Sequence, residues 1–63
     1  MTLSDRQNAI VELIRQEGYQ AIEALAEHFG VTPQTIRRDV NLLCEARLLR
    51  RLHGGAELLS GAE

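Results

Sequence analysis

The chain has 63 residues, of which 44% are hydrophobic and 25% are charged, and its net charge is −2. A chain of this length forms one small domain that buries only about 60% of its unfolded surface, so it has no room for a separate substrate domain. The single cysteine, Cys44, excludes an internal disulfide framework, and no apolar run is long enough to span a bilayer. We therefore expect a small globular domain of the cytoplasm, with no signal peptide and no membrane partner.

The first predicted helix covers about residues 5–17. Ser4 and Gln7 have the spacing of a capping box, in which each satisfies a free backbone N–H of the other. Three apolar residues then recur at helical spacing: Ile10, Leu13 and Ile14. Gly18 supplies the C-terminal stop. The next three residues, 19–21, are too few for a helix and favour a brief strand.

The second predicted helix follows at once and ends at Gly30. Its apolar residues occupy positions i, i+3, i+4 and i+7 without a gap: Ile22, Leu25, Ala26 and Phe29. A short connection containing glycine then leads to a third helix. This is the link expected between the positioning helix and the recognition helix of a helix-turn-helix unit.

The third predicted helix, at about residues 33–46, has the clearest start signal in the chain. Thr32 is a good N-cap, and Pro33 suits the first helical position, where a missing N–H costs nothing. One side of the helical wheel carries an apolar stripe for the interior: Ile36, Val40 and Leu43. The opposite side carries four polar residues: Gln34, Arg37, Arg38 and Asn41.

This outward face has the side chains that recognise base edges in DNA. Arginine can make paired hydrogen bonds to guanine, and glutamine or asparagine can make them to adenine. The alternative is an ordinary solvated helix face. The N-cap, the proline, the preceding turn and the use of arginine and amides in place of lysine together favour nucleic-acid binding.

After the third helix the sequence predicts a β-hairpin, or wing, at about residues 48–59. An apolar and basic strand at 48–52 precedes a glycine turn at 53–56 and a second short strand at 57–59. Three helices followed by such a hairpin are mainly α and predict a winged helix-turn-helix. The wing residues expected to contact phosphate or the minor groove are Arg50, Arg51, His53, Gly54 and Gly55. The alternative is that the two glycines only serve a turn with positive φ and that His53 is merely solvated.

The charge distribution supports a polyanion partner despite the negative total. Residues 1–31 hold five acids and two arginines, a net charge of −3, whereas residues 32–56 hold five arginines and two acids, a net charge of +3. The remaining acids, Glu57 and Glu63, follow that basic segment. An acidic back and a basic front are typical of a domain that presents one surface to phosphates.

At this point the residues resemble the DNA-binding head of the DeoR-type repressors, over about residues 3–58. Two motifs in one register make the resemblance specific: Thr35-Ile36-Arg37-Arg38-Asp39 in the third helix and His53-Gly54-Gly55-Ala56 in the wing. The resemblance implies a helix-turn-helix unit at about residues 20–39 and a double-stranded DNA operator as partner. It implies recognition contacts from Thr32, Gln34, Thr35, Arg37, Arg38 and Asn41, and a wing at 51–55.

The resemblance also implies parts that lie beyond this chain. Residues 60–63 would begin a linker to a C-terminal effector domain, which would bind a phosphorylated sugar or a related metabolite and release the operator. Such repressors control operons for carbohydrate uptake and breakdown and bind DNA as homo-oligomers.

One departure from the family pattern concerns the start of the second helix. Family members usually carry serine or threonine at the position of Ala21, where the hydroxyl caps the helix. Alanine cannot accept that hydrogen bond, and such a replacement costs about 0.5–2 kcal/mol. Glu23 would offset a little of this through the helix dipole.

Several other residues have structural interpretations. Asp39 is an acid within a basic face, and we expect it to be a local partner that orients Arg37, Arg38 or another arginine through an ion pair. Arg47 lies near the core side of the helical wheel, so its stem is expected to pack there. Cys44 with His28 and His53 lacks the close paired spacing of a zinc site, so no metal or other cofactor is expected.

No nucleophile, base and orienting group can be placed together, so an enzyme is not expected. Two alternatives to a repressor head stay open. One is a winged helix that binds protein, which should show an apolar patch in place of the outward amides and arginines. The other is a regulatory head fused to an enzyme.

Overall fold

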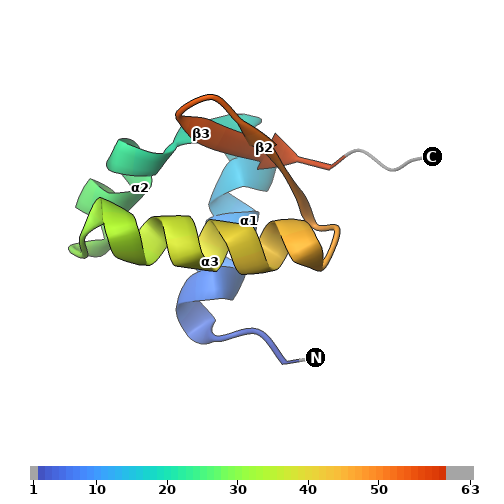
Figure 1. Cartoon of the computed structure of the whole chain (residues 1–63), viewed down its shortest axis with the longest axis horizontal. Helices are drawn as coiled ribbons and strands as arrows, with labels where there is room; N and C mark the ends of the chain where they lie inside the picture. Colours follow the sequence, from blue (N-terminus) through green and yellow to red (C-terminus); the bar gives the residue numbers. More distant parts are fainter. Residues whose placement is uncertain (1, 60–63) are drawn as a thin grey trace.

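The computed structural model describes residues 2–59, which form three helices and a small antiparallel sheet. The elements in chain order are α1 (Asp5–Glu17), β1 (Tyr19–Ala21), α2 (Ile22–Phe29), α3 (Pro33–Glu45), β2 (Leu49–Leu52) and β3 (Gly55–Leu58). Figure 1 shows α3 lying across the front of the molecule, with α1 crossing behind it and the sheet along one side. This is the predicted mainly helical, winged helix-turn-helix architecture. The predicted linker at 60–63 lies outside the described residues.

The helix starts confirm two predicted caps and one missing cap. The hydroxyl of Ser4 accepts a hydrogen bond from the backbone N–H of Gln7 at 3.1 Å, and the capping box is complete. Thr32 caps α3 through the N–H of Thr35. Ala21 provides no side-chain cap for α2. The wing turn makes up for part of this missing cap. It satisfies the first backbone N–H of α2, because the N–H of Ile22 donates to the carbonyl oxygen of Gly54 at 2.9 Å.

The core joins all three helices to the inner face of the sheet. The apolar stripes predicted from helical spacing are buried, and two strand residues complete the interior. The buried apolar side chains are Ile10, Ile14, Ile22, Leu25, Ala26, Ile36, Val40, Leu43, Leu49 and Ala56. Since α3 contributes three of its residues to this core, its opposite side is held toward solvent.

The wing differs from its prediction at the turn and in the second strand. The expected turn at 53–56 is wrong, because β3 begins at Gly55 and the turn is limited to His53 and Gly54. Gly54 has a φ of +75°, whereas Gly55 is paired with Leu52 on one side and with Ala21 on the other. The strand begins earlier because β1 also pairs with it, which places β3 at the centre of a three-stranded sheet in the order β1-β3-β2.

The end of α3 is closed by a residue in the left-handed region. Arg47 has a φ of 64°, its N–H donates to the carbonyl of Cys44, and the N–H of Leu48 donates to the carbonyl of Leu43. These two bonds form a Schellman motif, whose left-handed position normally holds glycine. The expected stem packing of Arg47 against the core is wrong, because the residue lies past the helix end and is exposed.

Replacing Arg47 by glycine should raise the free energy of unfolding by about 0.5–1 kcal/mol. Glycine adopts this conformation without the Cβ penalty of about 1–2 kcal/mol, and its greater freedom in the unfolded chain offsets part of the gain. Urea denaturation followed by circular dichroism measures the difference. The matched control is Arg15→Gly in α1, which removes an arginine from a right-handed helical position in the last turn and should destabilise the domain. Loss of stability in Arg47→Gly would contradict the assigned role of this position.

Candidate nucleic-acid interface

The outward side of α3 carries the four polar residues predicted for it. Gln34, Arg37, Arg38 and Asn41 are exposed, and together with Leu42 they line a shallow groove of about 380 Å³. We call these four residues the recognition face. Leu42 was not predicted as part of this surface, although its 40% exposure makes it available for contact with a thymine methyl group. The helical wheel therefore placed the polar residues correctly on one accessible surface.

The arginines of the recognition face are not neutralised within residues 2–59. Ion pairs in this part of the chain join Arg6 to Asp39, Arg15 to Glu12 and Arg50 to Glu57. None of them involves Arg37 or Arg38. Two positive charges therefore stand at the surface of one helix outside the ion pairs of the described residues, which is the electrostatic pattern expected where phosphates approach.

Thr32 and Thr35 stand at the start of the same helix, and their hydroxyl groups contact each other. The two Oγ1 atoms lie 3.1 Å apart, and Thr32 Oγ1 also accepts from the N–H of Thr35 at 3.3 Å. Thr32 is exposed, whereas Thr35 is half-buried. The pair thus serves first to begin α3, and Thr32 is the more accessible of the two for a further contact.

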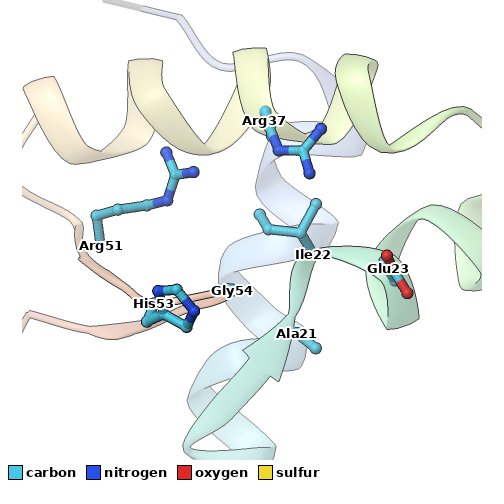
Figure 2. A pocket seen from close by; sticks show the side chains of 7 residues that line it. All are labelled: Ala21, Ile22, Glu23, Arg37, Arg51, His53 and Gly54. Carbon is cyan, nitrogen blue, oxygen red and sulfur yellow. The ribbon is translucent and has the colours of Figure 1, made fainter.

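A second groove, of about 490 Å³, lies between the start of α2, α3 and the wing. Its lining includes Arg37 from α3, Arg51 from β2 and His53 from the wing turn. Figure 2 shows the guanidinium group of Arg51 reaching from the wing toward α3, and that of Arg37 lying beside α3 above Ile22. The lining also includes Glu23 at the start of α2, so the tertiary structure brings the recognition face and the wing together around a depression that holds two arginines and one carboxylate.

The two wing arginines lie on opposite faces of the sheet. Arg50 pairs through Nε with Glu57 Oε2 at 2.8 Å, and its Nη2 contacts the same oxygen. Arg51 turns toward α3, where its Nη1 donates to Oδ1 of Asn41 at 2.7 Å. Alternation along a strand accounts for the difference. Arg51 thus joins the recognition face, whereas Arg50 is neutralised away from it.

The other three wing residues predicted as contacts differ in their exposure. His53 and Gly54 are exposed at the turn, where they border the second groove. Gly55 is buried in the sheet. A Cβ at this position would lie 2.5 Å from the carbonyl oxygen of Gln20 and 2.6 Å from Cζ of Tyr19. The place of Gly55 in the wing is therefore to allow close packing against β1.

Asp39 anchors α3 to α1. The residue is only 4% exposed, and its Oδ2 accepts from Nε of Arg6 at 2.5 Å. Its Oδ1 accepts from Nε2 of Gln7 at 3.1 Å. The hydrogen bond to Asp39, followed by the attraction of its charge, raises the pKa of Arg6. Asp39 pairs with an arginine as expected, but the local role expected for it is wrong, because the partner is Arg6, 33 residues away, and not the neighbouring Arg37 or Arg38.

Sequence reasoning did not find the roles of Arg6 and Gln7 in this anchor. Gln7 uses both ends of its amide, since Oε1 accepts from the N–H of Ser4 at 3.0 Å while Nε2 donates to Asp39. The capping box was a visible signal for the first of these contacts. No sequence motif indicated the contact of Gln7 with Asp39, because 32 residues separate them.

Cys44 flanks the core, as expected. Burial raises the pKa of its thiol, and the nearby charge of Arg51 offsets part of that change. Within residues 2–59, no three histidine, cysteine or acidic side chains are grouped so as to hold a metal ion. In the same part of the chain, the helices are too short or too polar to cross a bilayer.

Comparison with known proteins places this geometry in a family. The DeoR-like helix-turn-helix domain matches residues 6–62. The chain is 53% identical over 62 residues to the glycerol-3-phosphate regulon repressor of Escherichia coli K12, covering 98% of this chain and 25% of that protein. It is 58% identical over 52 residues to the transcriptional repressor AccR of Agrobacterium fabrum, covering 82% and 20% respectively.

A less similar relative matches almost the same length of this chain. The HTH-type transcriptional regulator UlaR of Escherichia coli is 35% identical over 60 residues, which cover 95% of this chain and 24% of that regulator. The chain thus spans about a quarter of the length of these relatives. No solved structure gives a significant match. By its fold, its recognition face and its sequence, the chain belongs to the family of DeoR-like helix-turn-helix domains.

Proposed function

We propose that this chain is the sequence-specific DNA-binding head of a transcriptional repressor. The observation that carries the proposal is the recognition face of α3, on which two arginines without a carboxylate partner within residues 2–59 stand beside two amides. An α-helix fits the major groove of B-DNA, and these are the side chains that contact base edges there. The family match and the repressor names of the relatives support the same function.

In the proposed complex α3 lies in the major groove. Gln34, Arg37, Arg38 and Asn41 face the bases, with Thr32 and Thr35 at the start of the helix near the backbone. The wing turn at His53 and Gly54 approaches the backbone or the minor groove next to it. Of the two wing arginines, Arg51 is the one on the side that faces the duplex. Arg50 contributes only if its ion pair with Glu57 opens.

The names and lengths of the relatives support a proposal about the partners of the protein to which this head would belong. Regulation of a glycerol-3-phosphate regulon, named in one of them, supports control of a carbohydrate or sugar-phosphate operon. An effector domain following this head would bind the phosphorylated metabolite. Two heads in a homo-oligomer would occupy half-sites about 34–36 Å apart, one helical turn of DNA. This role places the protein in the cytoplasm, and it requires no catalysis by this domain.

The test is binding of the 63-residue chain to a duplex that it selects from a random pool, compared with a shuffled duplex of the same composition. Binding is measured by fluorescence anisotropy at a fixed salt concentration, because the phosphate contribution to affinity varies steeply with salt. We expect a clear preference for the selected duplex. Equal binding to both duplexes, or no binding, would contradict the proposal and leave a protein-binding winged helix as the alternative.

Arg38→Ala should lower the affinity for the selected duplex by about 2 kcal/mol, roughly thirtyfold. The loss should be concentrated at one base pair, because a paired contact to guanine distinguishes that base from the others. The matched control is Arg15→Ala, which removes an equal charge from α1 at an exposed ion pair. A loss that is uniform over all duplexes would instead assign Arg38 to a phosphate.

A further inference from the structure

Leu42 is a large apolar side chain on the accessible side of α3. It is 40% exposed, and it lines the shallow groove of about 380 Å³ together with the four residues of the recognition face. Within residues 2–59 it belongs neither to the core nor to the half-buried apolar side chains that pack against the core. The packing of the domain therefore does not account for a leucine at this position.

The helical geometry places Leu42 next to Arg38. At about 100° per residue, a step of four residues brings Leu42 to about 40° from Arg38 and one turn further along α3. The following residue, Leu43, is fully buried in the core, and this burial keeps Leu42 on the outside of the helix. In the proposed complex, Leu42 therefore lies on the part of α3 that enters the major groove.

The surroundings of Leu42 fit a base edge better than a protein surface. A protein-binding surface would present a contiguous apolar patch, whereas the other four residues that line this groove are polar or charged. The other large apolar side chains that are exposed within residues 2–59 lie on or next to the strands, and none of them lines this groove: Tyr19, Leu48, Leu58 and Leu59. Leu42 is thus a single apolar contact among groups that form hydrogen bonds.

Thymine is the base that matches such a contact. Its major-groove edge carries a methyl group beside the O4 acceptor, and apolar side chains recognise thymine through that methyl group. The other three bases present only hydrogen-bonding groups in this groove. Burial of one methyl group against an apolar side chain corresponds to about a fourfold change in affinity.

We infer that Leu42 is a specificity-determining residue, which contacts the methyl group of a thymine in the operator. The inference rests on the proposed DNA-binding function and adds an apolar contact to the hydrogen bonds expected from the recognition face. Because leucine has no donor or acceptor in its side chain, Leu42 distinguishes thymine by the methyl group alone.

The experiment replaces each thymidine of the selected duplex, one at a time, by deoxyuridine. This change removes the methyl group and keeps the base pair and its hydrogen-bonding groups. Fluorescence anisotropy at a fixed salt concentration gives the affinities of the wild-type chain, Leu42→Ala and Leu42→Met. At one thymidine we expect deoxyuridine to weaken binding of the wild type by about fourfold, and binding of Leu42→Met by a similar factor. Leu42→Ala should bind the thymidine and deoxyuridine duplexes equally at that position.

Leu48→Ala serves as the control for a general effect of removing a leucine. Leu48 is 37% exposed, close to the value for Leu42, but it follows the end of α3 and lines neither of the two grooves. This variant should keep the full loss at deoxyuridine.

A stability measurement separates a contact with DNA from a role in folding. The midpoint of urea denaturation of Leu42→Ala should be no lower than that of the wild type, because the side chain is exposed and alanine favours a helix at least as well as leucine does.

Two results would overturn the inference. One is that no replacement of a thymidine by deoxyuridine weakens binding of the wild type. The other is that Leu42→Ala keeps the wild-type loss at every deoxyuridine position, which would assign the methyl contacts to other side chains. Failure of the wild type to select any duplex would instead refute the proposed function itself, and with it this inference.

Discussion

Replacing Asp39 by alanine is expected to lower the free energy of unfolding by about 3 kcal/mol. The carboxylate is almost fully buried and accepts hydrogen bonds from Arg6 and from Gln7. Hydrogen bonds to a charged group contribute about 1.5–3 kcal/mol each, and removing one member leaves its partners without an acceptor. A domain of this size has only about 3–9 kcal/mol in total, so the variant should be close to unfolding at 37 °C.

The measurement is urea denaturation at pH 7 followed by circular dichroism. Glu12→Ala is the matched control, since it breaks an ion pair between exposed side chains and should change the stability by less than about 0.5 kcal/mol. Asp39→Asn should fall between the wild type and Asp39→Ala, because its amide oxygen still accepts one hydrogen bond. If Asp39→Ala were as stable as the control, the anchor between α1 and α3 would have no energetic role.

The Asp39 anchor also bears on DNA binding. Asp39 lies on α3 directly after Arg38, and its contacts fix that helix to α1. The side chain itself is buried against α1, away from the side of α3 that faces the duplex in the proposed complex. We therefore expect Asp39→Ala to lose affinity in proportion to the fraction of unfolded chain, with the base preference of the folded fraction unchanged.

Gly55→Ala should be destabilising by about 3 kcal/mol, at the upper end of the range for an inserted methyl group. The new Cβ would lie 2.5 Å from the backbone oxygen of Gln20 and would also meet the phenol ring of Tyr19. The tyrosine side chain can rotate away, but the carbonyl of Gln20 belongs to the strand next to Gly55 and cannot move without breaking the pairing with β3. Thermal unfolding measures the loss.

A double variant separates the two causes of strain at Gly55. Tyr19→Ala combined with Gly55→Ala removes the ring and leaves the backbone oxygen in place. It should therefore recover only part of the stability lost in Gly55→Ala, judged against Tyr19→Ala alone. Full recovery would show that the phenol ring is the entire obstacle, and unchanged stability of Gly55→Ala would contradict the close approach of β1 to β3.

Local sequence determined the helices and the face of α3. Apolar spacing and capping residues act within one or two helical turns, so Ser4 and Thr32 placed the starts of α1 and α3, and Gly18 and Gly30 placed the ends of α1 and α2. The same spacing buried Ile36, Val40 and Leu43 and thereby directed Arg37, Arg38 and Asn41 outward. These features depend on chain neighbours alone, which is why one sequence sufficed.

Only the tertiary structure determined the strand pairing and the side-chain contacts between residues that are far apart in the sequence. Gly55 lies in a strand rather than a turn because β1 supplies a second pairing edge, and Arg6 meets Asp39 although 33 residues separate them. Arg50 and Arg51 look equivalent in the sequence, but strand alternation sends one to Glu57 and the other to Asn41. Contacts between remote elements leave no periodic signal in the chain, because their geometry is set only when the elements pack.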